Sequence, residues 1–173
     1  ENLVDLDYGV KKNIKLLSEA KNVAPSNLTA CLLKRPRHDF IVKDLTEMGV
    51  NIDFITDGDV SAAISVGYTS KKIDMYLGVG GGPEGVLAAA ALKCLGCQMQ
   101  TRLKFQNNKE KNNAKKLGIK ELEMKYNIND MVKGDVIFCA TGVTDGDFVK
   151  GINENKETFN AETLLLHYSN KTN

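Results

Sequence analysis

The sequence contains no tryptophan and is poor in histidine, proline and arginine. Its two histidines, His38 and His167, have no spacing to each other or to a cysteine pair that would hold zinc. Among 23 basic side chains only three are arginine. The formal net charge is +1, so no overall field predicts binding to nucleic acid or to an anionic membrane surface.

Long apolar runs are also missing. The longest covers residues 86–92, is rich in alanine, and is far too short to span a bilayer. No secretory signal peptide is visible, although the first residue is Glu1 rather than methionine. We therefore expect no membrane partner and a location in the cytoplasm.

The four cysteines do not form a disulfide framework. Cys31 and Cys139 lie in apolar, strand-like runs, where a free cysteine is usually a small buried hydrophobe. Cys94 and Cys97 form a CxxC that closes a predicted helix, whereas a redox CxxC normally opens one. We expect four reduced thiols, with a redox-regulated interaction domain as a less favoured alternative.

The 173 residues are enough for one domain with a real core. Hydrophobic periodicity alternates along the chain between strand and helix. We expect strands at 28–33, 50–56, 73–79, 98–105, 135–140 and 163–167, and helices at 10–21, 38–48, 60–66 and 84–95. The polar segment 107–116 is predicted as a solvated helix or loop. This order predicts a single α/β domain over 1–173, a layered α/β sandwich with a largely parallel sheet.

The unusual loops all follow predicted strands. They read RPRH at 35–38, DGD at 57–59, GGGPEG at 80–85 and TGVTDGD at 141–147. Because ligands of open α/β sheets bind beyond the carboxyl ends of the strands, we expect these loops to converge on one edge.

Two of the three arginines flank Pro36 in the first of these loops. The planar guanidinium groups of Arg35 and Arg37 can grip phosphate through paired hydrogen bonds, which lysine cannot reproduce. The alternative is a surface turn with solvated arginines. His38 is expected to cap the helix or to hydrogen-bond within its own loop rather than to act as a base.

The segment Asp57-Gly58-Asp59 has two interpretations. Asp and Gly favour turns, and Asp59 could be the N-cap of the following helix. Alternatively, carboxylates and backbone N–H groups at a helix start bind the hydroxyls of a sugar phosphate. The sequence leaves both open, and the same holds for 141–147.

Residues 80–85 formally match the dinucleotide fingerprint GxGxxG, between a predicted strand and a predicted helix. Glu84, however, would place a carboxylate where a pyrophosphate must lie, and no acid ends the next strand to hold a ribose. A carboxylate beside a bare glycine loop can instead hold a hard divalent cation. Complementing the helix dipole is the simpler alternative.

These motifs, in this order and with this spacing, resemble class II fructose-1,6-bisphosphatase, including the cyanobacterial fructose-1,6-/sedoheptulose-1,7-bisphosphatase. The runs at 83–93 (PEGVLAAAALK) and 140–147 (ATGVTDGD) are the most specific. The resemblance covers nearly the whole chain but only about the carboxyl-terminal half of the family's length. It implies half of a metal-dependent sugar-phosphatase fold of the inositol-phosphatase type.

The resemblance also implies an activity: hydrolysis of the 1-phosphate of fructose 1,6-bisphosphate to fructose 6-phosphate in gluconeogenesis, aided by Mg²⁺ or Mn²⁺. Under it Glu84 is a metal ligand, and the substrate-binding residues are Arg35, Pro36, Arg37, Asp57, Gly58, Asp59 and Gly81. No catalytic residue is assigned in this half, because the remaining metal-binding carboxylates are expected in an amino-terminal half outside it.

From these points we expect a metal-dependent phosphatase in the full-length protein and an inactive fragment in this chain alone. The alternative is a non-catalytic module that binds a sugar phosphate or a nucleotide through the same loops. A homo-oligomer is expected, because an absent amino-terminal half would leave a large apolar face to cover.

Overall fold

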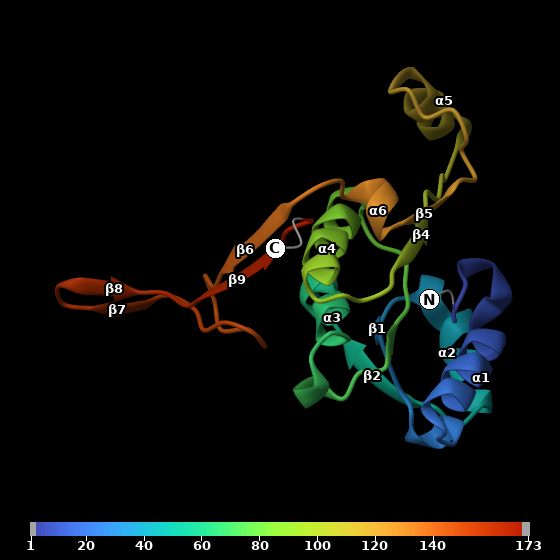
Figure 1. The fold of residues 1–173 in the computed structure, drawn as a ribbon, viewed down its shortest axis with the longest axis horizontal. Helices are drawn as coiled ribbons and strands as arrows, with labels where there is room; N and C mark the ends of the chain where they lie inside the picture. Colours follow the sequence, from blue (N-terminus) through green and yellow to red (C-terminus); the bar gives the residue numbers. More distant parts are fainter. Residues whose placement is uncertain (1–2, 171–173) are drawn as a thin grey trace.

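A computed structural model describes residues 3–170 of the chain. Its centre is a three-stranded sheet in the order β2-β1-β3, in which both pairs are parallel (Figure 1). The strands are β1 (Thr29–Leu33), β2 (Asn51–Ile55) and β3 (Met75–Tyr76). The central strand β1 is almost continuously apolar and buried, as expected for a parallel strand covered on both faces.

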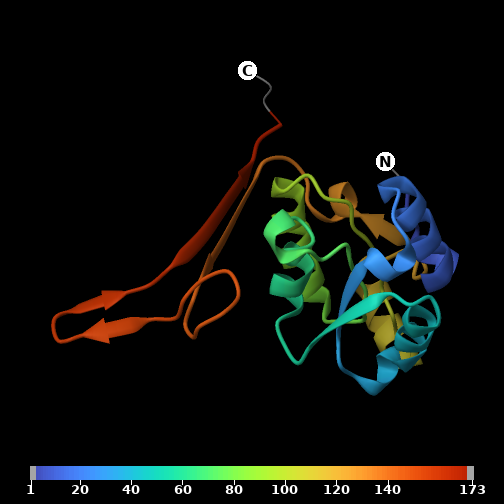
Figure 2. The same cartoon turned by 90° about the horizontal axis from the view of Figure 1, so that it is seen from below.

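Helices cover both faces of this sheet (Figure 2). The helices α1 (Gly9–Lys21) and α2 (Asp39–Glu47) lie on one side, and α3 (Asp59–Ser65) and α4 (Gly82–Cys94) lie on the other. Gly49, with φ of +70°, follows α2 and ends it in the left-handed conformation predicted from the sequence. The layered α/β architecture is therefore confirmed.

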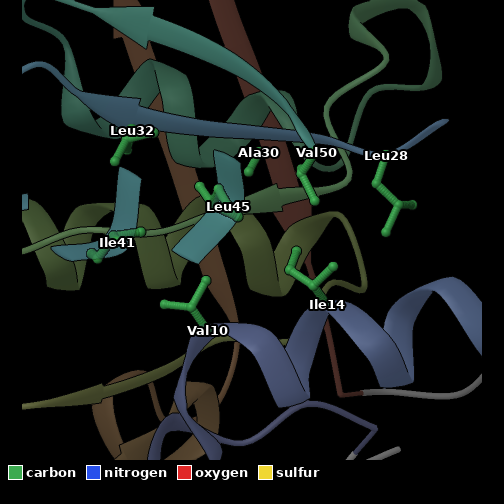
Figure 3. Close-up of a cluster of buried hydrophobic side chains, with 8 residues drawn as sticks. All are labelled: Val10, Ile14, Leu28, Ala30, Leu32, Ile41, Leu45 and Val50. Atoms are coloured by element: carbon green, nitrogen blue, oxygen red, sulfur yellow. The ribbon is translucent and has the colours of Figure 1, made fainter. Parts of the chain in front are cut away.

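The main core lies between the sheet and the first helix pair. Ile14 of α1, Leu32 of β1 and Leu45 of α2 are each at most 1% exposed and pack together (Figure 3). Burying side chains of this size is worth about 1.5–3 kcal/mol each. This cluster holds β1 in place, and the carboxyl end of β1 is where the first candidate loop begins.

The strands predicted at 98–105, 135–140 and 163–167 do not join the parallel sheet. They are found as β4 (Gln100–Arg102), β6 (Val136–Thr141) and β9 (Thr163–Tyr168), and each belongs to an antiparallel pair. β4 pairs with β5 (Lys125–Asn127), and β6 pairs with β9. The prediction of a largely parallel sheet thus holds for β1–β3 only.

Further short elements complete the described chain. They are the helices α5 (Asn108–Lys116) and α6 (Ile128–Met131), the strands β7 (Asn153–Asn155) and β8 (Thr158–Asn160), and the 3-10 turns η1 (Leu6–Tyr8), η2 (Pro25–Asn27), η3 (Pro36–His38) and η4 (Thr69–Lys71). Within residues 3–170 no helix is both long enough and apolar enough to cross a bilayer.

The pair β6–β9 forms a ribbon that lies against α3 and α4 through one face. Phe138 and Leu166 lie opposite each other on this inner face, and both pack in the cluster with α3 and α4. On the other face Ile137 and Leu165 are exposed. Beyond the ribbon, the hairpin β7–β8 projects as an arm away from the body (Figures 1 and 2).

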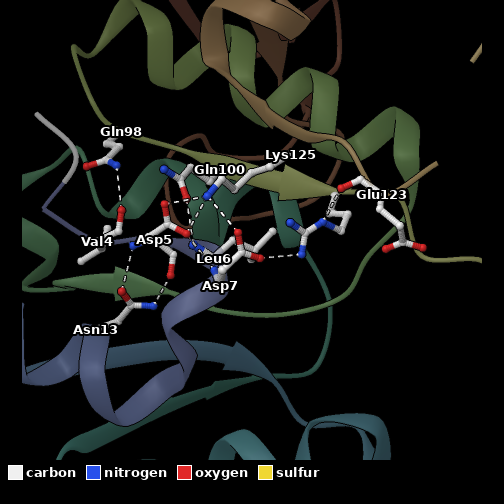
Figure 4. Close-up of polar contacts among 10 residues, drawn as sticks. Val4, Asp5, Leu6, Asp7, Asn13, Gln98, Gln100, Glu123 and Lys125 are labelled. Atoms are coloured by element: carbon white, nitrogen blue, oxygen red, sulfur yellow. Dashed lines mark hydrogen bonds and ion pairs between the residues drawn. The ribbon is translucent and has the colours of Figure 1, made fainter. Parts of the chain in front are cut away.

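Ion pairs between side chains hold the segment before α1 against the β4–β5 pair (Figure 4). The ammonium group of Lys125 lies 2.6 Å from the Asp5 carboxylate and 3.0 Å from that of Asp7. Arg102 lies 2.7 Å from Asp7. Hydrogen bonds from Arg102 and Lys125 lower the pKa of Asp7 from 3.8 to about 2. Residues more than ninety positions apart are thus held together.

We predict that Asp7→Asn will lower stability near neutral pH and that its effect will fade in acid. Because the pKa of Asp7 is depressed in the folded chain, its contribution is fully present above 3.8 and disappears as pH falls through about 2. Denaturant unfolding of both proteins, followed by circular dichroism across this range, measures the difference. The control is Glu19→Gln, which removes an exposed pair with Lys15 and should change little. A difference that stays constant down to pH 2 would contradict the prediction.

Candidate functional site

Three of the predicted loops meet at the carboxyl ends of β1, β2 and β3. They enclose a pocket of about 500 Å³. The residues that line it are Leu33, Arg35, Arg37, Asp57, Gly58, Asp59, Val60, Val79, Gly80, Gly81, Glu84 and Gln106. The convergence expected from parallel-sheet topology is therefore found for these three loops.

The loop after β1 contributes both arginines. Arg35 donates hydrogen bonds to the backbone carbonyls of Lys34 (3.1 Å) and Thr56 (2.8 Å). Arg37 donates from Nε and Nη2 to the carbonyl of Val79, at 3.0 and 2.6 Å. Each guanidinium keeps further N–H groups for a ligand, since arginine carries five. Pro36 begins the turn η3 and is not among the residues that line the pocket.

The segment Asp57-Gly58-Asp59 connects β2 to α3. Asp57 accepts a hydrogen bond from the backbone N–H of Gly58 (2.8 Å), whose φ of +89° suits glycine. The N-cap of α3 is Gly58, and no side chain caps it, so the alternative of Asp59 as N-cap is wrong. Asp59 is instead the first helical residue. Its Oδ1 atom is buried without a hydrogen-bond partner in the described structure.

The glycine loop brings Glu84 into the pocket. Helix α4 begins at Gly82, and the exposed Glu84 lies in its first turn. The Glu84 carboxylate folds back against Gly81 so closely that a Cβ atom on Gly81 would overlap Oε2. A Cβ on Gly80 would in the same way meet Oδ2 of Asp59. A side chain on either glycine would therefore displace the carboxylate that lies against it.

The charges of the pocket are mixed. Two arginines face three carboxylates, those of Asp57, Asp59 and Glu84. A phosphate group suits the arginines and the N-terminus of α4. The carboxylates favour a cation, and Asp59 has a buried oxygen, Oδ1, without a hydrogen-bond partner in the described structure that a cation could contact. Within residues 3–170, however, no group of three or more His, Cys, Asp or Glu side chains could hold a metal. Glu84 fits as one oxygen ligand of a site that needs others.

Two further residues were missed by the sequence analysis. Gln106 lines the pocket, and its position at the carboxyl end of a predicted strand could have indicated it. Tyr76 lies near Asp59; burial raises its pKa, and the Asp59 carboxylate adds to the effect, so its hydroxyl stays protonated. No sequence pattern marks Tyr76, because only the packing of β3 beside α3 brings it there.

The fourth predicted loop, 141–147, does not reach the pocket. It contacts the segment after α3, at the end of that helix opposite Asp59: Lys71 donates to the Asp147 carbonyl (3.1 Å), and the rings of Tyr68 and Phe148 lie 5.0 Å apart. The expected convergence of all four loops is wrong here, because β6 lies outside the parallel sheet. Gly142 is explained by a close approach to the backbone of Lys150.

The cysteines remain thiols in the structure. Burial raises the pKa of Cys31 to about 11 and also raises the pKa of Cys94 and Cys97. All four cysteines are free. A raised pKa reduces the thiolate fraction on which redox reactivity depends, so the structure does not favour a redox CxxC.

A second hollow of about 430 Å³ lies behind the glycine loop. It is lined largely by apolar side chains, among them residues of α1, α3, β3 and α4. It shares Asp59, Gly80, Gly81 and Glu84 with the first pocket. The glycine loop is thus a thin wall between a polar and an apolar space.

The whole chain, residues 1–173, matches the family model described as bacterial fructose-1,6-bisphosphatase, glpX-encoded. The chain belongs to this family of bacterial fructose-1,6-bisphosphatases. Curated relatives agree: the chain is 33% identical over 98% of its length to a D-fructose 1,6-bisphosphatase class 2/sedoheptulose 1,7-bisphosphatase of Synechococcus sp. (strain JA-2-3B'a(2-13)). It is 32% identical over 99% of its length to a fructose-1,6-bisphosphatase class 2 of Haemophilus influenzae.

This member of the fructose-1,6-bisphosphatase family spans about half the length of the curated relatives that it matches. The matched regions cover 52% of the Synechococcus protein and 56% of the Haemophilus protein. All residues of the pocket lie inside the family match.

We predict that Gly81→Ala will displace the Glu84 carboxylate without unfolding the chain. The backbone of Gly81 is extended (φ −72°) and alanine can adopt it, so the clash falls on the mobile end of the Glu84 side chain. The matched control is Gly82→Ala, since a Cβ there meets nothing within 4 Å. Crystal structures and thermal unfolding of both variants test this; an unmoved Glu84 in Gly81→Ala would show that the contact is not restrictive.

Proposed function

We propose that the full-length protein hydrolyses the 1-phosphate of fructose 1,6-bisphosphate to fructose 6-phosphate, with Mg²⁺ or Mn²⁺ as cofactor. The observation that carries this proposal is the pocket, in which two arginines and three carboxylates meet at the glycine loop before α4. The family match and the names of both relatives support the choice of substrate.

Each group of the pocket has a role in this proposal. Arg37 and Arg35 hold a phosphate through the N–H groups that they do not give to backbone carbonyls. The hydroxyls of the sugar are oriented by Asp57, Gly58 and Asp59, so that binding energy serves alignment. Gly81 contacts the substrate through its backbone, and its missing side chain leaves room for the Glu84 carboxylate. Pro36 contributes by shaping the arginine loop rather than by contact.

Glu84 is proposed as a ligand of the divalent cation. A bound Mg²⁺ or Mn²⁺ supplies Lewis-acid polarisation of the phosphoryl oxygens and a water molecule of lowered pKa. The residues described here do not complete its coordination. We therefore propose that residues 1–173 are the carboxyl-terminal, substrate-binding half of a sugar phosphatase of the inositol-phosphatase type. The other carboxylate ligands then come from an amino-terminal half.

The same proposal covers the location, the oligomeric state and the partners of the protein. The enzyme is placed in the cytoplasm as a homo-oligomer, with a sugar bisphosphate as its small-molecule partner and with neither nucleic acid nor a membrane bound. The exposed Ile137 and Leu165 on the outer face of β6–β9 support association, because they leave an apolar strip uncovered.

We predict that Glu84→Gln in the full-length enzyme will lower kcat by about 100-fold or more and change KM much less. The amide keeps the size of the side chain but loses the charge that holds the cation. Even the mutation of residues that only support the metal ligands lowers metal affinity or activity by about 10- to 100-fold. Phosphate release at limiting Mg²⁺ measures the effect. The control is Glu157→Gln, the same chemical change in the turn of the β7–β8 arm. Near-normal turnover of Glu84→Gln would rule out the metal role.

We also predict that the 173-residue chain by itself will not hydrolyse fructose 1,6-bisphosphate at a useful rate. Within residues 3–170 no group of three or more His, Cys, Asp or Glu side chains could hold the metal. Phosphate release by the purified chain, compared with the full-length enzyme at equal concentration, is the measurement. Turnover close to that of the full-length enzyme would show that the chain carries a complete catalytic site.

A further inference from the structure

His38 is buried at the start of α2 and forms hydrogen bonds through both ring nitrogens. It is 0% exposed. Its Nδ1 lies 2.8 Å from the carbonyl oxygen of Leu33, and its Nε2 lies 2.9 Å from the backbone nitrogen of Val79. His38 occupies the N-cap position of α2, but its side chain makes no capping hydrogen bond. The ring instead reaches the end of β1 and the loop after β3.

The two contacts define the tautomer. The Leu33 carbonyl can only accept a hydrogen bond, so Nδ1 must carry the proton. The Val79 backbone N–H can only donate, so Nε2 must present its lone pair. The ring is therefore neutral, and both of its nitrogens are in use. A histidine with this arrangement has no free site for proton transfer, which excludes His38 as a general base.

The neighbouring residue holds the other polar group of Val79. Arg37 donates two hydrogen bonds to the Val79 carbonyl, while His38 accepts one from its N–H. The ring also lies close to Gly78, where a Cβ would be 3.4 Å from Cε1. Two consecutive residues after β1 thus fix one residue after β3 from both sides.

Val79 is the last residue with a side chain before Gly80, Gly81 and Gly82. Glycine has the greatest backbone freedom of any residue, so this loop cannot fix its own path. Its far end is held by the start of α4, where the Gly85 N–H donates to the Gly81 carbonyl (3.1 Å). Its near end is held by the bonds to Val79.

We propose that His38 is a positioning residue, which sets the path of the glycine loop and thereby the place of the Glu84 carboxylate over Gly81. The same bonds orient Arg37, because its guanidinium is held on the Val79 carbonyl. This inference rests on the proposed function for its consequence, the binding of metal and phosphate. The anchoring of the loop itself can be measured without any activity.

The test compares two amides at position 38. A glutamine amide extends as far as Nε2 of the ring and can accept from the Val79 N–H. An asparagine amide reaches only as far as Nδ1 and can donate to Leu33 alone. Both substitutions disturb the same buried space, so His38→Gln and His38→Asn separate the contact with the loop from the general cost of losing the ring.

In the full-length enzyme, we expect His38→Asn to raise the half-saturating Mn²⁺ concentration and to lower kcat/KM by about 10- to 100-fold. His38→Gln should stay much closer to the unmodified enzyme, although both variants unfold at a lower temperature. A purely structural role would make the two losses follow the two unfolding temperatures. Equal losses in both variants would overturn the inference.

Two measurements on the protein without substrate keep this result independent of the proposed reaction. Nitrogen-15 spectra of the imidazole should show a protonated Nδ1 and an unprotonated Nε2. Hydrogen exchange at the Val79 amide should be faster in His38→Asn than in His38→Gln. If the unmodified enzyme hydrolyses no bisphosphate, the proposed function fails, and the exchange rates still decide the anchoring role. A protonated Nε2, or equal exchange in both variants, would refute it.

Discussion

The pocket depends on how one backbone residue is held. Val79 carries no functional group, yet its N–H is bonded to His38 and its carbonyl to Arg37. Both side chains follow β1, which lies at the centre of the sheet and is buried along nearly its whole length. The position of the glycine loop is therefore set by that strand. The loop in turn sets the position of the first turn of α4 and of the Glu84 carboxylate.

This arrangement accounts for the separation of charges in the pocket. The arginines are turned onto backbone carbonyls, whereas the carboxylates of Asp59 and Glu84 lie against glycines. The guanidinium groups and these carboxylates therefore line the same pocket without forming an ion pair with each other. A salt bridge between them would occupy the groups that hold the phosphate and the cation in the proposed function. Because the arginines donate to backbone carbonyls instead, these groups remain available for that role.

Much of this could be predicted from the sequence, because apolar periodicity marks β1 and the helices, and the end of a parallel strand marks a binding edge. Arg35, Arg37, Asp57, Asp59 and Glu84 were found in this way and do line the pocket. The direction of β6 and β9 was not predictable, since alternation of side chains is the same in parallel and antiparallel strands. The hydrogen bonds of His38 and the ion pairs of Lys125 join segments that are distant in the sequence, so no local sequence pattern predicts them.

The β7–β8 arm has a practical consequence for anyone who handles this protein. Its strands are exposed throughout, and Phe159 is 73% exposed, so the arm adds length without adding a packed core. A particle with such a projection diffuses more slowly than a sphere of equal mass. Its elution from a sizing column therefore overstates its mass. Light scattering, which measures mass without assuming a shape, is the sound basis for its stoichiometry.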